Sequence, residues 1–373
     1  MTIIHMSTVH PRDDSRILHK EIRTLANDAG FKVAFYVQDG EGDAVDAKNG
    51  CTIVDTGRPM PRLRRMTVGA ARMIAAVRRA RPRLVFFHDP ELIPWALLLK
   101  LYGIRVIYDV HEDYPAAVSR NRRLPWMLRP ALGVITGVVE RLCSVFFDGI
   151  VAVSPEIASR FPSGKTVVVR NSPVIDELAA PSPVSMPSRP KHFAYIGTIN
   201  EDRNIHAMVR CIGSLPDPDA RLRLAGTFTT PGLKESVSIA AGWERVLYDG
   251  WLSRDGVRDL LAEVRAGLLL IKPIPHEMTG MPIKMCEYMA ASVPIIASDF
   301  PFWREIVEGT GAGIVVDPLD DDAIIRAMDW MLENPEEAAE MGRRGRQAVL
   351  ERFNWDVEAE QLLSITRKAL ATV

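Results

Sequence analysis

The residues best suited to chemistry in the first half of the chain follow two apolar runs. LVFFHDPEL ends on His88 and Asp89, and VIYDVHEDYP continues into His111 and two carboxylates. Imidazole and carboxylate groups at such places can move protons, hold hydroxyl groups or bind a metal. Their spacing matches no zinc motif, so we expect no metal. Two histidines at predicted strand ends, each followed by a carboxylate, favour a role in a functional site; the alternative is a structural role, which is the commoner one for a single histidine.

A second group stands in TGMPIKMCEYMAASVPIIASD, residues 279–299. Its glycine-containing loop leads to Pro282, which predicts the first residue of a helix. The N–H groups at such a helix start bind phosphate, and Lys284 in the first turn adds a positive charge. Glu287, one turn deeper, can accept hydrogen bonds from two adjacent hydroxyls. The residues predicted to hold a diphosphate here are Gly280, Met281 and Lys284. The alternative is an amphipathic helix with a solvated lysine and glutamate.

A third group lies near residue 200. Tyr195-Ile196-Gly197-Thr198 leaves an apolar run and leads to Arg203, whose guanidinium can contact two phosphate oxygens at once. An early loop, TVHPRDDSR, offers further polar groups. The other residues that we expect around the site are Asp14, Arg16, His88, Asp89, Gly197, Thr198 and Thr279.

Short apolar runs alternate with helical stretches along the whole chain, which predicts doubly wound parallel sheets. The predicted strands are 3–6, 32–37, 52–55, 84–88, 106–110, 150–153, 167–170, 192–197, 222–225, 246–248, 268–271, 294–297 and 313–316. A proline-rich stretch separates two series of strands. We therefore predict a first domain over 1–173, a linker over 174–191, a second domain over 192–355, and a final helix over 356–373. Ligands bind at the carboxyl edges of such sheets.

These motifs resemble those of glycosyltransferases of family four. Many members carry Glu-x7-Glu before a Pro-Val-Ile-Ala strand, and a sub-pattern reads P-x-K-x-x-E-Y-M-A-x-G-x-P. The residues that match the sub-pattern are Pro282, Lys284, Glu287, Tyr288, Met289, Ala290 and Pro294. Ser292 stands where glycine is usual. The first glutamate of the pair is replaced by Thr279, and Glu277 lies ten residues before Glu287.

The resemblance implies a GT-B fold: two Rossmann-like domains facing across a cleft, with a C-terminal helix that returns to the first domain. It implies transfer of a sugar from a nucleoside-diphosphate sugar, with retention and without an essential metal or other cofactor. Glu287 would hold the ribose, and His111 matches the active-site histidine of the family. The family's diphosphate loop reads G-R-x(4)-K-G, so Arg203 takes the lysine position, while Thr198 replaces the arginine.

Composition excludes several classes of protein. The chain has 373 residues, of which 47% are hydrophobic and 25% charged, so it is neither disordered nor a polytopic membrane protein. Four cysteines lie far apart, which favours buried thiols over a disulfide framework. The opening MTIIHMSTVH predicts no signal peptide, and we expect a cytoplasmic location.

Positive charge is concentrated in the first half. Residues 1–180 carry a net charge of +6, although the whole chain carries −1, and nine arginines with no acidic residue lie between Arg58 and Arg83. A second basic stretch, SRNRRLPWMLRPALG, adds tryptophan and leucine, which is typical of a helix in a lipid interface. We predict docking on an anionic membrane through Arg62, Arg64, Arg65, Arg120, Arg122, Arg123, Trp126 and Arg129. A solvated helix face is the alternative, and no nucleic-acid module is present.

The sequence thus predicts a cytoplasmic glycosyltransferase, peripheral on the inner face of a membrane, in cell-surface polysaccharide or glycolipid synthesis. Its expected partners are a nucleotide-sugar donor, a saccharide or lipid-linked acceptor and an anionic membrane surface, and no nucleic acid. Two alternatives remain open. One is a nucleotide-sugar-processing enzyme of the epimerase type, and the other is a non-catalytic subunit that binds the nucleotide sugar.

Overall fold

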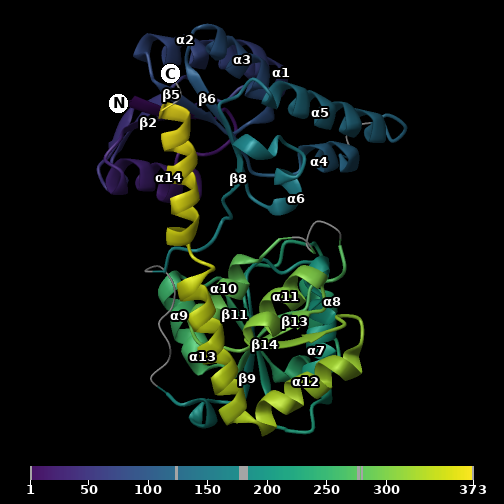
Figure 1. Cartoon of the computed structure of the whole chain (residues 1–373). Helices are drawn as coiled ribbons and strands as arrows, with labels where there is room; N and C mark the ends of the chain where they lie inside the picture. The colour runs from purple at the N-terminus through teal and green to yellow at the C-terminus, as the bar shows by residue number, and fades with distance from the viewer. Residues whose placement is uncertain (1, 122–124, 176–183, 275–277, 279, 372–373) are drawn as a thin grey trace. The chain divides into compact units, whose positions relative to one another are not determined.

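A computed structural model describes residues 2–121, 125–175, 184–274, 278 and 280–371 (Figure 1). The chain forms two compact units. Unit 1 combines Met1–Asn171 with Trp355–Val373, and unit 2 is Ser172–Asn354. The unit boundaries lie at residues 171 and 354, where the sequence predicts domain ends at 173 and 355. Each unit is an α/β fold around one mainly parallel sheet.

Unit 1 has an eight-stranded sheet in the order β3-β4-β2-β1-β5-β6-β7-β8. Its central strands are apolar on both sides, as expected of a sheet covered by helices on both faces. Only the pairing of β3 with β4 is antiparallel among the described strands of this sheet. The strands are β1 (Thr2–Met6), β2 (Lys32–Val37), β3 (Ala44–Asp46), β4 (Cys51–Asp55), β5 (Leu84–Phe87), β6 (Arg105–Val110), β7 (Gly149–Ala152) and β8 (Thr166–Val168).

Helices cover both faces of this sheet. Residues on α2 and α3 pack with Ile4, Val85 and Tyr108 on one face. The other face is covered by η1 and by α14, which contacts β6, β7 and β8, so the C-terminal helix belongs to unit 1 as expected. The helical segments are η1 (Ile17–Ile22), η2 (Thr24–Asp28), α1 (Arg62–Arg64), η3 (Arg65–Gly69), α2 (Ala70–Ala80), η4 (Pro90–Leu92), α3 (Ile93–Leu101), α4 (Tyr114–Arg120), α5 (Arg129–Ser144), α6 (Pro155–Ala158), η5 (Ser163–Lys165) and α14 (Trp355–Ala371).

Unit 2 has a six-stranded parallel sheet in the order β11-β10-β9-β12-β13-β14. Alternate residues of its first strand face opposite sides: Phe193 and Tyr195 join one core, and Ala194 and Ile196 join the other. The strands are β9 (His192–Ile196), β10 (Arg221–Ala225), β11 (Val246–Gly250), β12 (Ala266–Leu269), β13 (Ile295–Ser298) and β14 (Gly313–Val316).

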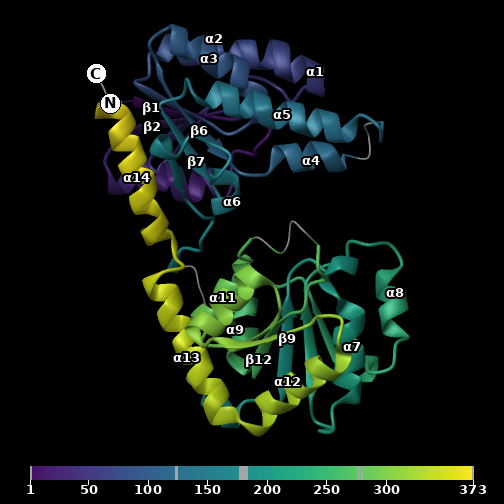
Figure 2. The ribbon, with the colours of Figure 1, turned by 45° about the vertical axis from the view of Figure 1, so that its right-hand side comes forward.

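The helices of unit 2 divide between these two cores. Residues of α7, α8 and α12 pack in the first core, and residues of α9, α10, α11 and α13 pack in the second. Figure 2 shows both sets around the sheet. The helical segments are η7 (Met186–Ser188), η8 (Glu201–Arg203), α7 (Ile205–Ser214), α8 (Leu233–Ser238), η9 (Trp243–Arg245), α9 (Arg254–Glu263), α10 (Ile283–Ala290), α11 (Pro301–Thr310), α12 (Asp321–Glu333) and α13 (Pro335–Glu351).

The thirteen predicted strands all appear, with ends shifted by one or two residues. Two local details differ from the prediction. Pro282 has extended backbone angles and caps α10, so the helix begins at Ile283 rather than at the proline. The short strand β3 and the helix α4 were not expected, because neither has enough residues to show a clear hydrophobic period.

Candidate functional sites

Both sheets reverse their strand order at one place. In unit 1 the reversal falls between β1 and β5, and in unit 2 it falls between β9 and β12. Neighbouring connections leave a sheet in opposite directions at such a point, which opens a crevice at the carboxyl ends of the strands. The predicted site residues of each unit follow these strands or their neighbours, so the topology of each sheet brings them together.

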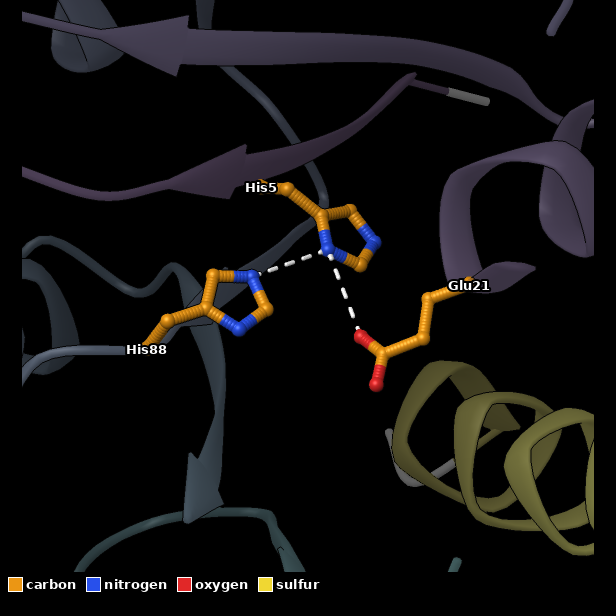
Figure 3. A group of neighbouring side chains, drawn as sticks. All are labelled: His5, Glu21 and His88. Carbon is orange, nitrogen blue, oxygen red and sulfur yellow. Dashed lines mark hydrogen bonds and ion pairs between the residues drawn. The ribbon is translucent and has the colours of Figure 1, made fainter. Parts of the chain in front are cut away.

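In unit 1 three histidines and one carboxylate form a connected group. His88 Nδ1 lies 2.9 Å from Asp109 Oδ2, and His111 Nε2 lies 2.6 Å from the same oxygen. His88 Nε2 lies 3.1 Å from His5 Nδ1. Figure 3 shows His5 between His88 and Glu21, with Glu21 Oε2 3.9 Å from His5 Nδ1. The structure therefore joins His88 and His111, as their strand ends predict, and adds three buried residues.

Arg16 supplies the positive charge of this group. It is buried, and its guanidinium donates to Val169 O at 2.9 Å and to Asp109 Oδ1 at 3.2 Å. Its Nε also forms an ion pair with Glu21 Oε1 at 2.9 Å. Arg16 was predicted as a residue lining a ligand site, but the structure places it inside unit 1 with three protein partners.

The pKa shifts in this group follow from burial and from Arg16. Burial alone would raise the pKa of Asp109, but the charge of Arg16 and the contacts with His111 and His88 hold it well below its usual range. Burial raises the pKa of Glu21 well above its usual range, and the neighbouring Asp109 raises it further. Burial lowers the pKa of His5, and it lowers the pKa of His88 to about 4. These directions favour an ionised Asp109 beside Arg16, with His5 and His88 neutral.

The early loop is held against the end of β5 by Asp89. Its carboxylate accepts bonds from Ser7 Oγ at 3.0 Å and from Thr8 N at 2.6 Å. Asp14 lies farther along the loop and contacts His10 Nδ1 at 3.1 Å. The rings of His10 and His111 have centroids 4.7 Å apart, so the loop does lie beside the predicted catalytic histidine.

Two sets of three residues could offer ligand atoms to a metal. One is His5, Glu21 and His88, and the other is His88, Asp109 and His111. Arg16 contacts a carboxylate of each set, which places a permanent positive charge where a metal would need negative ligands. Protons on the histidines also account for the short contacts to Asp109. The donor set therefore fits a hydrogen-bonded network better than a metal centre.

We expect the buried histidines to make the protein less stable in acid. Between pH 6.5 and about 4 the unfolded chain binds a proton at His88, whereas folded His88 stays neutral, so the free energy of unfolding falls as the pH falls. His5 acts in the same direction, and Glu21, whose pKa is raised, acts in the opposite one. Thermal unfolding should show a lower midpoint at pH 5 than at pH 7, and a smaller drop in His88→Gln. An equal drop in both proteins would contradict this origin.

In unit 2 a glycine and a lysine meet at the end of β9. Gly197 has φ of 124°, which favours glycine, and a methyl group at this position would lie 2.0 Å from Lys284 Cε. The lysine chain therefore crosses directly over the backbone of Gly197. Lys284 was predicted to contact the diphosphate and Gly197 to lie around the site, and the structure brings the two into contact across 87 positions of sequence.

Glu287 lies one turn farther along α10 than Lys284. Its carboxylate makes no hydrogen bond or ion pair with any residue that the structure describes, although it is half-buried. Burial raises its pKa, while Lys284 and Arg254 lower it. A partly buried carboxylate without a protein partner is available to accept hydrogen bonds from ligand hydroxyls. Glu287 is thus the clearest acceptor group at this end of unit 2.

The remaining predicted donor residues surround the same edge. Arg203 ends η8 and is half-buried, and Thr198 is exposed. Gly280 O accepts a bond from Trp303 Nε1 at 2.8 Å, and Met281 packs with the second core. Thr279 lies outside the described residues, as do Arg122 and Arg123.

Two positions that are glycine in the resembling patterns have left-handed backbone here. Asn204, directly after Arg203, has φ of 55°, and Ser292 has the same value. Asparagine adopts this conformation more readily than other side chains, whereas serine does so at some cost. Both residues therefore hold a backbone conformation that favours glycine.

The basic residues predicted to dock on a membrane occupy several places in unit 1. Arg62 and Arg64 are exposed on α1, but Arg65 donates to both oxygens of Glu91 at 2.7 and 2.8 Å. Arg120 ends α4, Arg129 begins α5, and Trp126 is 74% exposed. No described helix has both the length and the apolar character needed to cross a membrane.

Sequence reasoning missed the buried members of the unit 1 group. His5, Glu21 and Asp109 lie on β1, η1 and β6, and their side chains meet on the face of the sheet that carries η1 and α14. A charged residue inside the apolar run VIYDV was the available signal, because an aspartate in a buried strand requires a partner.

Two family models match the sequence, one for each unit. The model described as "Glycosyltransferase Family 4" matches residues 15–171, and the model described as "Glycosyl transferases group 1" matches residues 179–348. Together they span most of the chain.

Curated relatives and solved structures agree with these matches. An alpha-maltose-1-phosphate synthase of Mycolicibacterium smegmatis is 27% identical over 73% of this chain and 75% of its own length. An MMP alpha-(1->4)-mannosyltransferase of Mycolicibacterium hassiacum is 24% identical over 88% of this chain and 80% of its own. The Anabaena protein HepE, solved with UDP, has a TM-score of 0.73 at 13% identity and covers 98% of this chain and 100% of its own. A sucrose-phosphate synthase of Thermosynechococcus elongatus has a TM-score of 0.72 at 16% identity, covering 99% of both chains. Matched along both units in sequence and in fold, the chain belongs to the family 4 glycosyltransferases and has their GT-B fold.

Proposed function

We propose that the protein is a retaining glycosyltransferase that moves a sugar from a nucleoside-diphosphate sugar to a saccharide or lipid-linked acceptor. Unit 2 binds the donor, and unit 1 binds the acceptor. The product serves cell-surface polysaccharide or glycolipid synthesis. The observation that carries the proposal is the carboxylate of Glu287, which pairs with no described residue and lies on the helix that also carries Lys284, at the carboxyl edge of unit 2.

The donor site combines two kinds of group. Lys284 over Gly197, together with Arg203, supplies positive charge for a diphosphate, and Glu287 accepts hydrogen bonds from the ribose hydroxyls. The diphosphate gains charge as the sugar leaves, so cations fixed before the reaction stabilise the transition state. HepE, a structural neighbour, was solved with UDP-glucose, which supports a nucleotide sugar as donor.

We assign the chemistry in unit 1 to His111, without a metal ion or other cofactor. Its ring is partly exposed beside the loop that carries His10, and its Nε2 contacts the carboxylate of Asp109. Arg16 already balances the charge of Asp109, so the group requires no metal for neutrality. A chelator should therefore leave the transfer rate unchanged.

A thermal-shift screen with UDP, GDP, ADP and their sugars tests the donor proposal. A nucleotide sugar at 100 times its Kd stabilises the folded protein by about 2.7 kcal/mol. Product analysis with added saccharide acceptors then separates the three candidate functions. A transferase needs the acceptor, an epimerase changes the nucleotide sugar without one, and a binding subunit is stabilised but changes nothing. No stabilisation by any of these compounds would contradict the donor site.

We further propose that unit 1 docks on an anionic membrane from the cytoplasmic side, and that α5 is the element that enters the lipid. Figures 1 and 2 both show α4 and α5 side by side at one edge of unit 1. The inward positions of α5 are small or polar: Gly133, Glu140 and Ser144 are buried. A methyl group at Gly133 would lie 2.7 Å from Pro115 O, so the close contact with α4 requires glycine there.

The outward face of α5 is apolar, which reverses the usual pattern of a surface helix. Its large exposed apolar side chains, together with those of the two residues that follow the helix, are Val134, Ile135, Val138, Val139, Leu142, Val145 and Phe146. Burying a side chain of this size contributes about 1.5–3 kcal/mol. Leaving seven of them in water on one stripe therefore strongly favours a covered state.

The charges around the apolar face of α5 favour a lipid bilayer over a second copy of the chain as its binding partner. Glu140, the only acidic residue of α5, points inward, where it accepts from Tyr108 Oη at 2.8 Å and pairs with Arg160. Arg141 of α5 and Arg120 at the end of the neighbouring α4 are both exposed. Two copies packed through α5 would bring arginines together without carboxylates, whereas lipid phosphates pair with them. Each basic residue near an anionic surface contributes about 1 kcal/mol.

Flotation with anionic vesicles tests this docking. The protein should float at low salt and partly remain bound at high salt, because salt screens the arginines but leaves apolar insertion in place. Replacing Val134, Val138 and Leu142 together by serine should remove the salt-resistant part. Ile239→Ser, at an exposed apolar position of unit 2, is the matched control and should change nothing. Protein that stays at the bottom at low salt, or a dimer that the triple variant abolishes, would refute the proposal.

A further inference from the structure

The carboxylate of Asp109 fixes where several protons lie in unit 1. Its Oδ1 faces Arg16, and its Oδ2 faces both His88 Nδ1 and His111 Nε2. An aspartate held ionised by a buried arginine can only accept hydrogen bonds. Both histidine nitrogens that face it must therefore carry protons.

This assignment propagates through the buried network. His88 is fully buried beside the charged pair of Arg16 and Asp109, so its ring is neutral and its second nitrogen, Nε2, is bare. Nε2 then accepts from His5 Nδ1 at 3.1 Å, which places the proton of His5 on Nδ1. The ring of His5 is stacked on Phe86 with centroids 4.5 Å apart, which fixes the plane of the ring. This arrangement of protons fits the contacts of Asp109 with His88 and His111 and the contact of His88 with His5, the last of which Figure 3 shows.

The consequence for substrate binding concerns His111. Its Nε2 is engaged by Asp109, and its Nδ1 makes no hydrogen bond with any residue in the described part of the chain. The side chain is 10% exposed, so the ring has access to a ligand. We propose that Asp109 and His88 are positioning residues that hold the proton of His111 on Nε2 and so present Nδ1 as a hydrogen-bond acceptor for a substrate hydroxyl. The proposal rests on the role of His111 in the proposed function.

This arrangement specifies the chemistry of the group that His111 can recognise. A bare imidazole nitrogen accepts from a hydroxyl and repels a carboxylate or phosphate oxygen, which has no proton to donate. The opposite tautomer would do the reverse. His88 also fixes the orientation of the ring, because its own ring lies against His111 edge to face, with centroids 5.2 Å apart. A sugar hydroxyl is the ligand that fits, whether it belongs to the acceptor or to the donor sugar.

Nitrogen NMR of the histidine-labelled protein tests the proton positions directly, without substrate. Protonated and bare imidazole nitrogens have widely separated shifts, and His111→Asn identifies the His111 signals among eight histidines. We expect Nε2 of His111 to be protonated and Nδ1 to be bare at pH 7.5. The reverse assignment would overturn the proposal, as would a ring protonated on both nitrogens. Stoichiometric metal in the purified protein would also overturn it.

Asp109→Asn tests the consequence for the reaction. The amide can donate to His111 Nε2, which moves the ring proton to Nδ1 and removes the acceptor. We expect kcat to fall at least tenfold while the KM for the donor stays within threefold, together with a matching exchange of the two nitrogen shifts. Asp322→Asn is the control: Asp322 is exposed on α12 of unit 2, so the same change of a carboxylate to an amide there should leave the His111 shifts and kcat unchanged.

The two readouts distinguish failure of this inference from failure of the proposed function. If no donor supports transfer, the proposed function fails, and the nitrogen shifts still decide the proton positions. If Asp109→Asn exchanges the shifts but retains kcat within threefold, the positioning role is wrong. If Asp109→Asn does not fold, the shifts of the wild type and of His88→Gln remain decisive. In His88→Gln the proton should stay on Nε2, and kcat should fall because the ring loses its orienting neighbour.

Discussion

His111→Ala is expected to lower the rate of sugar transfer at least tenfold, which corresponds to about 1.4 kcal/mol of activation free energy. The ring lies beside the early loop at the carboxyl edge of unit 1, with one nitrogen bound to Asp109. Nucleotide binding should survive, because the groups assigned to the nucleotide all lie in unit 2. The measurement is kcat with saturating donor, together with the Kd of the nucleoside diphosphate by calorimetry.

His206→Ala is a suitable control for this variant, since His206 lies on α7 in unit 2 and contacts Ser236. It removes an imidazole without touching the unit 1 network, so its transfer rate should equal that of the wild type. Full activity in His111→Ala would remove the histidine from the mechanism. Equal losses in both variants would indicate a general effect on folding.

Glu287→Ala is expected to weaken binding of the nucleoside diphosphate by about ten- to 150-fold. Hydrogen bonds that involve a charged group contribute about 1.5–3 kcal/mol, and every 1.4 kcal/mol is tenfold in Kd. Because no described residue pairs with this carboxylate, its loss should cost the folded protein little. Calorimetric titration with UDP and GDP measures the effect separately from catalysis.

Glu305→Ala provides the matched control, because Glu305 is an exposed glutamate on α11 of the same unit. It should bind nucleotide as the wild type does. Unchanged affinity in a folded Glu287→Ala protein would show that the ribose lies elsewhere. A Glu287→Gln variant should retain part of the affinity, since the amide oxygen still accepts one hydrogen bond.

The sheets could be predicted from sequence because their strands are short, apolar and rich in β-branched residues. Runs such as residues 32–37 and 294–297 show this pattern without reference to the rest of the fold. The helix of unit 2 that carries Lys284 and Glu287 was equally visible, because both residues lie within one local motif. The contact of Lys284 with Gly197 agrees with a parallel sheet, which the alternation of strands and helices predicts. In such a sheet both residues lie near the carboxyl ends of strands.

The network around Asp109 could not be predicted in the same way. Its members are residues 5, 16, 21, 88, 109 and 111, which lie far apart in the sequence. No local sequence pattern indicates that the side chain of Arg16 is buried rather than exposed to a ligand. The orientation of α5 could not be predicted from the sequence for a related reason. Its sequence shows apolar residues with helical spacing, but only the glycine contact with α4 and the buried Glu140 determine which face turns outward.

The position of α14 has a consequence for how the protein folds during synthesis. Unit 2 is continuous from Ser172 to Asn354, whereas unit 1 is completed only by a helix that is translated after all of unit 2. Leu362, Ile365 and Ala369 of that helix are buried, and Trp355 donates to Thr24 Oγ1 at 2.8 Å. The half of the chain that the ribosome makes first is therefore completed last, and in the interval the sheet face that carries the charged group of Arg16 and Asp109 lacks the part of its cover that α14 supplies. Chaperones that bind nascent chains would therefore bind this protein at unit 1.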